Sequence, residues 1–255
     1  MERQTRRLEL IAPPGLPEIS PGDDLARLLV DGFAAAGHAL QDGDIVVVAQ
    51  KIVSKSEGRI FDLADVAPGA EAERLAAETG KDARLLELVL RESDGVVRTR
   101  PGLIIARHRL GFVVANAAVD HSNGGGGEVA ILLPEDPDAS AARLRAEISS
   151  IVGGDVAVVI NDSMGRAWRN GTIGTAVGAS GIVALDDRRG RADRDGVVLV
   201  SSEIGLADEI ASAASLLMGQ GDESLPAVLV RGATWAAGDG SASDLVRPLD
   251  QDLFR

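Results

Sequence analysis

The stretch "DVAVVINDS" (residues 155–163) decides how the rest of the chain is interpreted. Its apolar run predicts a β-strand that ends at Asp162. Polar residues gather where the run stops. Strand ends commonly carry functional groups in folds that mix strands and helices, because a rigid sheet positions the loops there. The segment therefore predicts both a strand and a candidate site at its end.

Other segments extend this pattern in both directions. "DGDIVVVAQ" (42–50) predicts a buried strand introduced by an Asp-Gly turn. Further strands are expected at 8–12, 128–134 and 227–232, and two more around Leu110-Gly111. Helices are expected in "PGDDLARLLVDGFAAAG", capped by Asp23 or Asp24, in 70–93 with a break at Gly80, in "PDASAARLRAEISSIVG", capped near Ser140, and in "GLADEIASAASLLMG". Strands and helices do not alternate strictly, which favours one continuous unit of the α/β or α+β class.

The composition excludes several classes of protein. No cysteine occurs among the 255 residues, which rules out disulfides, thiolate metal sites and a cysteine nucleophile. The formal net charge is −13, the opposite of a nucleic-acid-binding or anionic-membrane-binding surface. No apolar run reaches the roughly 18–20 residues that span a bilayer. The start does not resemble a signal peptide, so a cytoplasmic protein is expected.

Two common nucleotide-binding signatures are also missing. No G-x-x-x-x-G-K-[ST] motif occurs, so the sequence has no P-loop. The glycines at 171, 174, 178 and 181 do not have the spacing of the Rossmann dinucleotide fingerprint, and close packing of the backbone is the favoured explanation for them. A bound nucleotide would therefore need a site of another kind.

Polar clusters follow three of the apolar runs. They contain Lys51 and Lys55, then Asp120 and Asn123, and then Asp162, Ser163, Arg166 and Arg169. If these strand ends converge, they supply what a metal-chelated polyphosphate requires: carboxylates for a hard cation, and lysines and arginines for the remaining negative charge. Each residue taken singly also fits a structural role as a turn former, a helix cap or a solvated surface group.

Six segments in order resemble the coenzyme F420-0:L-glutamate ligase family, also called F420:gamma-glutamyl ligases. They are "GLPEI", "GDIVVVAQKIVSKSEGR", "ANAAVDHSN", "INDSMGRAWRNGTIGTAVGASG", "ADEIASAASLLMG" and "PAVLVRG". The resemblance runs from about residue 8 to about residue 235.

The resemblance implies a GTP-dependent amide ligase. Such an enzyme adds L-glutamate to the deazaflavin coenzyme precursor F420-0 and then a γ-linked glutamate, through an acyl phosphate, with release of GDP and phosphate. It also implies an α+β fold of mixed sheets and helices, an intertwined homodimer, and Mg²⁺ or Mn²⁺ beside GTP, two ions per site, with K⁺ left open. Residues 1–255 are expected to form a single ligase domain, with a division into two lobes left open and no C-terminal reductase-like domain.

Carried over by motif, the resemblance assigns site residues. Metal would be bound by Asp120, Asp162, Ser163 and Gln220. GTP would be contacted by Leu16, Pro17, Glu18, Ile19, Gln50, Lys51, Lys55, Asn123, Met218, Gly219, Gln220, Gly221, Asp222, Glu223, Ser224 and Leu225. Asp120, Asp162 and Arg166 are the expected catalytic residues. Gln220 departs from the family pattern, because some relatives carry a carboxylate there and an amide offers only a neutral carbonyl.

Two other functions use the same residues. A Mg²⁺-dependent phosphohydrolase could employ the same carboxylates, but it would release GDP without glutamate or the F420 precursor. A GTP-binding regulatory dimer would bind the nucleotide and turn nothing over.

Overall fold

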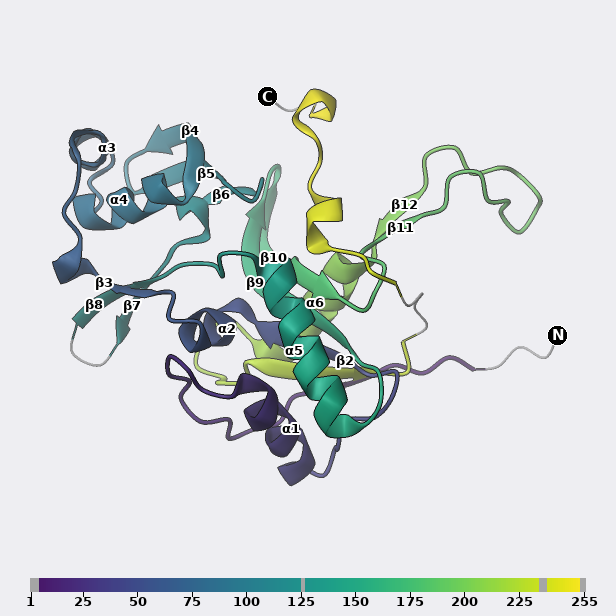
Figure 1. The fold of residues 1–255 in the computed structure, drawn as a ribbon. Helices are drawn as coiled ribbons and strands as arrows, with labels where there is room; N and C mark the ends of the chain where they lie inside the picture. The colour runs from purple at the N-terminus through teal and green to yellow at the C-terminus, as the bar shows by residue number, and fades with distance from the viewer. Residues whose placement is uncertain (1–4, 125–126, 234–237, 253–255) are drawn as a thin grey trace.

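A computed structural model describes residues 5–124, 127–233 and 238–252. Within them, a five-stranded sheet forms the main body of the molecule (Figure 1). The strands lie in the order β1 (Glu9–Ile11), β13 (Ala227–Arg231), β2 (Ile45–Ala49), β9 (Ala157–Arg166) and β10 (Arg169–Ser180). β2 and β9 are parallel and the other neighbours are antiparallel. Mixed sheets accompanied by helices confirm the α+β class.

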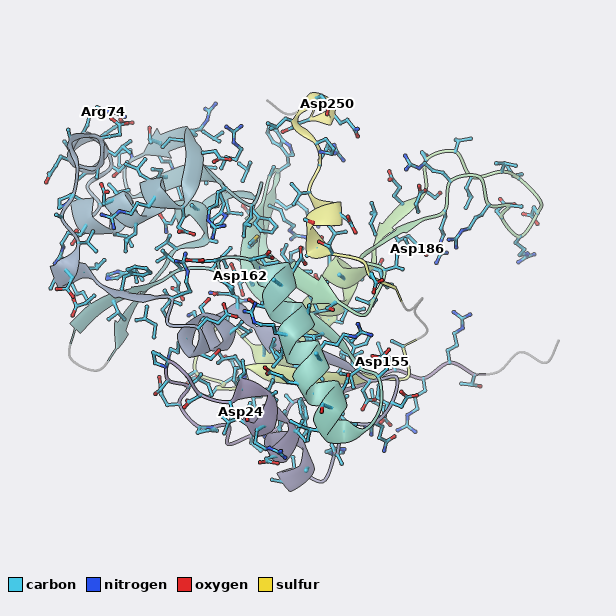
Figure 2. All side chains as sticks on the ribbon, viewed as in Figure 1. Asp24, Arg74, Asp155, Asp162, Asp186 and Asp250 are labelled. Atoms are coloured by element: carbon cyan, nitrogen blue, oxygen red, sulfur yellow. The ribbon has the colours of Figure 1, made fainter. Side chains whose placement is uncertain are left out.

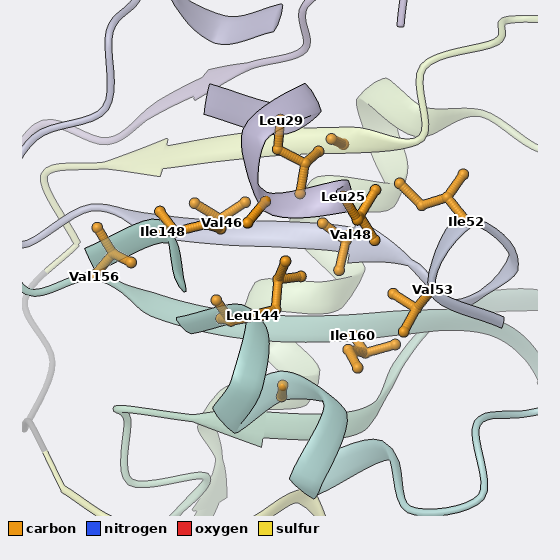
Figure 3. Packing of buried hydrophobic residues seen from close by; sticks show 14 of the residues in the cluster. Leu25, Leu29, Val46, Val48, Ile52, Val53, Leu144, Ile148, Val156 and Ile160 are labelled. Atoms are coloured by element: carbon orange, nitrogen blue, oxygen red, sulfur yellow. The ribbon is translucent and has the colours of Figure 1, made fainter. Parts of the chain in front are cut away.

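Helices cover both faces of this sheet. Val46 and Val48 of β2 pack into a core with α1 (Leu25–Ala35) and α5 (Pro137–Val152), as Figure 3 shows. Ile45 and Val47 point to the opposite core, which α6 (Leu206–Met218) completes. Burial on both faces is why these strands are continuous apolar runs rather than alternating ones.

A small lobe, residues 60–131, packs around a core of its own. It contains β3 (Ile60–Asp62), α3 (Ala70–Thr79), α4 (Ala83–Arg91), β4 (Ser93–Arg100), β5 (Leu103–His108), β6 (Val113–Ala115), β7 (Asp120–Gly124) and β8 (Gly127–Ile131). Its sheets have the orders β3-β8-β7 and β4-β5-β6. The break between the two helices falls at Gly80, which ends α3 in the left-handed conformation (φ 73°), as predicted.

A buried charged cluster links the small lobe to Arg59, the residue directly before its first strand. Glu92, only 7% exposed, lies 2.9 Å from an Arg59 guanidinium nitrogen and 3.3 Å from Arg109. His108 is fully buried, and its Nε2 lies 3.4 Å from the same carboxylate. Burial alone would raise the pKa of Glu92, but His108 and the two arginines outweigh it and lower the pKa to about 2.

The remaining elements connect these two parts. α2 (Gln50–Ser56) follows β2 without a gap. β11 (Leu185–Asp187) and β12 (Glu203–Gly205) form the base of an arm that projects from the body (Figure 1). Short 3₁₀ turns are η1 (Leu63–Asp65), η2 (Asn116–Ala118), η3 (Ala242–Leu245) and η4 (Leu249–Gln251). In the part of the chain described, no helix combines the length and apolar character needed to cross a membrane.

Two boundaries differ from the prediction. β9 continues past Asp162 to Arg166, because β10 pairs with it and extends the strand beyond the apolar run. α5 is capped by Asp136, whose side chain accepts the Ala139 N–H at 3.0 Å, and not near Ser140. Pro137 explains the difference, since proline suits the first helical position and makes the residue before it the cap.

Two β10 glycines confirm the close-packing explanation. A Cβ on Gly174 would stand 2.4 Å from the Ala211 carbonyl oxygen of α6. A Cβ on Gly178 would stand 2.3 Å from the Pro137 carbonyl oxygen of α5. A β-bulge between Ala176 and Gly178 explains how one strand presents these glycines to helices on opposite faces.

Candidate functional site

A cleft of about 640 Å³ lies where the pairing of β2 with β9 ends. Figure 2 shows Asp162 where the small lobe meets the main body. The predicted residues that line the cleft are Leu16, Pro17, Glu18, Ile19, Gln50, Lys51, Lys55, Asp120, Asp162, Ser163, Met218, Gly219, Gln220, Gly221, Ser224 and Leu225. Arg166, Asp222 and Glu223 are not part of its lining, and the side chain of Asn123 lies outside the described residues.

The topology explains this convergence. β2 and β9 are parallel neighbours, and their pairing ends at one edge of the sheet, where Ala49, the last residue of β2, lies opposite Asn161 of β9. Beyond that edge the first chain enters α2, which carries Lys51, and the second continues as Asp162 and Ser163. The expectation that these segments meet at one place is therefore fulfilled by the pairing of two strands about 110 residues apart.

Asp120 reaches the cleft from the small lobe after a strained turn. Asn116, Ala117 and Ala118 have φ values of 53°, 49° and 56°, in the left-handed region that costs non-glycine residues about 1–2 kcal/mol each. Lys51 Nζ lies 2.5 Å from Asp120 Oδ2. This oxygen is buried, and no other described group gives it a well-formed hydrogen bond. Strain of this kind is typical of functional sites.

Asp162 lies close enough to Asp120 for their charges to interact. Burial raises the pKa of Asp162 to about 7, a bond from the Ser163 N–H to Oδ1 at 2.8 Å opposes the rise, and the charge of Asp120 adds to it. Lys51 compensates only in part. Two carboxylates in one partly buried place, with a single lysine between them, favour an additional cation.

The lysines of α2 are held by acidic partners on opposite walls. Lys55 Nζ lies 2.5 Å from Glu18 Oε1, and its hydrogen bond and charge lower the pKa of Glu18. Gln50 is buried, and its Oε1 accepts a bond from Ser54 Oγ at 2.9 Å. The two lysines therefore lie along one wall of the cleft, where each could exchange its carboxylate for a phosphate oxygen.

The loop after α6 forms the third wall. Gln220 lines the cleft, and its Oε1 accepts a hydrogen bond from Thr172 Oγ1 of the neighbouring hairpin at 3.2 Å. Glu223 folds back on its own loop, where Oε2 accepts the Gly221 N–H at 2.8 Å. Bonds from loop amides lower the pKa of Glu223. This local role explains why Glu223 does not reach the cleft.

Asn161 lines the cleft and was missed by the sequence reasoning. It is buried, its Nδ2 donates to Ser215 Oγ at 3.0 Å, and it lies 3.3 Å from Met218 Sδ. Its Oδ1 has no hydrogen-bond partner among the described residues. An amide inside an otherwise apolar strand, directly before Asp162, is the signal that could have identified it.

The available ligands limit what the site can bind. Among the described residues, no group of three or more His, Asp or Glu side chains is placed to hold a metal ion. A cation here would have two carboxylates and neutral oxygens, a donor set that suits a hard ion shared with phosphate. A hollow of about 770 Å³ between α1 and α5 is larger, but its Arg143 and Glu57 pair with each other at 2.7 Å. The cleft is therefore the better candidate.

Comparisons with known proteins agree with the resemblance found in the sequence. Residues 15–232 match the family described as F420-0:Gamma-glutamyl ligase. A coenzyme F420:L-glutamate ligase of Methanothermobacter thermautotrophicus is 42% identical over 250 residues, covering 97% of this chain and 99% of that protein. Similar enzymes of Methanopyrus kandleri (44%, covering 93% and 94%) and Methanocaldococcus jannaschii (40%, covering 100% of both) also match. The chain therefore belongs to the F420-0:gamma-glutamyl ligase family.

Proposed function

We propose that this protein is a GTP-dependent ligase that joins L-glutamate to coenzyme F420-0 through an amide bond and then adds a γ-linked glutamate. The names of its relatives support the acceptor and the amino acid. The observation that carries the proposal is the convergence of Asp120 and Asp162 with Lys51 and Lys55 in one cleft. Carboxylates and lysines in this arrangement suit a nucleotide bound with a divalent cation.

The residues of the cleft fit Mg²⁺ or Mn²⁺. Asp120 Oδ2 is buried without a well-formed hydrogen bond, and the pKa of Asp162 is raised beside it, so both carboxylates would be stabilised by a cation. Asp120, Asp162, Ser163 and Gln220 are the proposed ligands, all through oxygen. When bound, two such ions would neutralise phosphate charge and make the terminal phosphorus more electrophilic; K⁺ is a further candidate.

The chain itself aligns the reactants. Lys51 and Lys55 form ion pairs with Asp120 and Glu18. Once these carboxylates have other positive partners, each lysine can turn to a phosphate oxygen of GTP. The backbone of the loop after α6, opened by Gly219 and Gly221, forms the wall against which the nucleotide would lie.

The proposed reaction needs no nucleophilic side chain. A carboxylate oxygen of the acceptor attacks the γ-phosphorus of GTP, GDP leaves, and an acyl phosphate forms. The neutral amine of glutamate then attacks the acyl carbon, phosphate leaves, and the amine loses a proton to give the amide. The protein contributes alignment and charge stabilisation. Arg166 stays a proposed contributor from the strand that also carries Asp162.

A homodimer is part of the proposal, and the projecting arm is its suggested contact. Val197, Val198 and Val200 on the arm are 62%, 56% and 81% exposed. Apolar side chains on an extended arm are typical of a surface that another subunit covers. Light scattering of wild type and Val200→Asp tests this, since the charged variant should shift the dimer towards monomer.

Mass spectrometry of a complete reaction tests the activity. The protein is incubated with F420-0, glutamate, GTP and Mn²⁺, and the product should gain the mass of one and then further glutamate residues. GDP release should require both F420-0 and glutamate. GDP release without them would indicate a phosphohydrolase, and GTP binding without any turnover would indicate a regulatory protein. Asp120→Asn should abolish product, whereas the exposed helix variant Asp31→Asn should not.

A further inference from the structure

The hairpin between β9 and β10 ends in an unusual group of side chains. Trp168 is 87% exposed at its tip. Arg166 and Arg169 flank the turn and are directly opposite each other in the strand register. Neither arginine side chain has a hydrogen bond or an ion pair with any residue in the described part of the chain. We call Arg166, Trp168 and Arg169 the tip cluster.

Each feature of the tip cluster lowers stability. Trp168 has a φ of 65°, a left-handed conformation that is uncommon for a bulky side chain. Like charges on directly opposed residues repel each other. A large aromatic side chain that is exposed to water does not gain the free energy of hydrophobic burial. Three departures from local preference at one turn, none compensated by a contact within the described chain, are expected where the residues bind something else.

The tip cluster adjoins the cleft. Gly165, next to Arg166, pairs with Thr172, and Thr172 Oγ1 donates to Gln220, which lines the cleft. Arg166 follows Ser163 by three residues, about 10 Å along an extended strand. The two-residue period also places Arg166 on the same face of β9 as Asp162. A ligand anchored at the phosphate end of the cleft could therefore extend along β9 to Trp168.

We propose that the tip cluster binds the acceptor of the ligation reaction, with Trp168 stacked on its deazaflavin ring and the arginine pair holding its negative charge. This inference rests on the function proposed above. The acceptor has to place its carboxylate beside the terminal phosphate while its planar ring lies elsewhere. An exposed indole offers a surface for stacking, and two unpaired guanidinium groups offer a place for an anion.

The nucleotide is a poorer match for this cluster. Its phosphates are matched by the lysines of α2 and by the loop after α6, which line the cleft. None of the three tip residues lines the cleft. The tip is therefore assigned to the longer, ring-bearing substrate, and it should contribute to the affinity for the acceptor and not to that for GTP.

Four variants test the assignment: Trp168→Ala, Trp168→Gly, Arg169→Ala and the control Arg100→Ala, which changes an exposed arginine in the small lobe. Binding of F420-0 is measured by calorimetry without GTP or glutamate, and KM is measured for all three substrates. Loss of aromatic stacking should weaken F420-0 binding and raise its KM roughly tenfold or more, with KM for GTP within about twofold of wild type. Arg100→Ala should behave as wild type.

Trp168→Gly separates binding from folding. Glycine tolerates the positive φ, so this variant should melt at or above the wild-type temperature while it loses F420-0 affinity. If the Trp168 variants bind F420-0 as wild type does, the proposal is wrong. It is also overturned if they raise KM for glutamate alone, or if they dissociate the protein, which would assign the tip to an interface between subunits. Because the binding assay needs no turnover, failure of the ligase activity itself would be seen separately in wild type.

Discussion

Replacing Asp162 by asparagine should stabilise the ligand-free protein at neutral and alkaline pH, although it removes a proposed metal ligand. The pKa of this carboxyl is raised from 3.8 to about 7, because burial disfavours its charged form, the Ser163 N–H offsets this only in part, and Asp120 adds like charge. Above pH 7 the folded protein therefore holds an anion in an unfavourable place. Asparagine has nearly the same shape and no charge.

The size and the sign of the effect follow from proton linkage. The unfolded chain releases the Asp162 proton near pH 4 and the folded protein near pH 7, so stability falls as the pH rises between these values. A rise of the Asp162 pKa from 3.8 to about 7 corresponds to at most about 4 kcal/mol. Water in the partly exposed cleft should reduce the gain to about 1–2 kcal/mol. That gain corresponds to a Tm increase of roughly 2–8 °C for a chain of this length.

Thermal melts at pH 4, 6 and 8, with and without Mn²⁺, measure the difference in stability between Asp162→Asn and wild type. Without metal, Asp162→Asn should melt above wild type at pH 8, and the difference should shrink towards pH 4. Added Mn²⁺ should raise the Tm of wild type and leave the variant unchanged, since only a binding-competent native state gains from the ion. Asp31→Asn, an exposed carboxylate on α1, is the control and should follow wild type throughout.

Two results would contradict this prediction. If Asp162→Asn melts at or below wild type at pH 8, the carboxylate is not held against its preference. If Mn²⁺ stabilises the variant as much as wild type, Asp162 is not a metal ligand.

Three further predictions concern other parts of the molecule. Glu92→Gln should cost about 2 kcal/mol in urea unfolding at pH 7, and the difference should fall away between pH 4.5 and pH 2, because the lowered pKa contributes stability only above that window. Gly174→Ala should lower Tm by roughly 4–10 °C, whereas Gly165→Ala, where a Cβ meets nothing within 4 Å, should have little effect on Tm. Gln220→Leu should raise the Mn²⁺ concentration for half-maximal rate and Gln220→Glu should lower it; equal values would remove the residue from the metal site.

The sequence predicted the interior of the fold well because apolar runs report burial directly. Residues 42–50 and 227–232 became neighbouring strands of a sheet covered on both faces. Gly80 separated two helices because only glycine adopts the left-handed end without cost. These features depend on a few adjacent residues, and local patterns therefore contain enough information to predict them.

Features that depend on contacts between residues far apart in the sequence were harder to predict. β9 continues to Arg166 because β10 pairs with it. The turn between them, at Ala167 and Trp168, contains neither the glycine nor the asparagine that would predict a hairpin. Glu223 was predicted in the nucleotide site, but it satisfies amides of its own loop. Asn161 lines the cleft because β9 pairs with β2, a strand far from it in the sequence.

The bulge in β10 has a consequence for any change in the length of this strand. Val177 is the extra residue, so Ala176 faces the α6 core, Val177 the α1–α5 core, and Ala179 the α6 core again. Deleting Val177 would remove the bulge and keep Gly178 opposite Ile160 and Ala179 opposite Val159, so Ala179 would still face α6. An insertion or deletion of one residue at another position in β10 would instead move apolar side chains from one buried face of the sheet to the other, and not from a buried face to water. Such an exchange leaves hydropathy unchanged, so length variants of β10 could misfold without any sign in their composition.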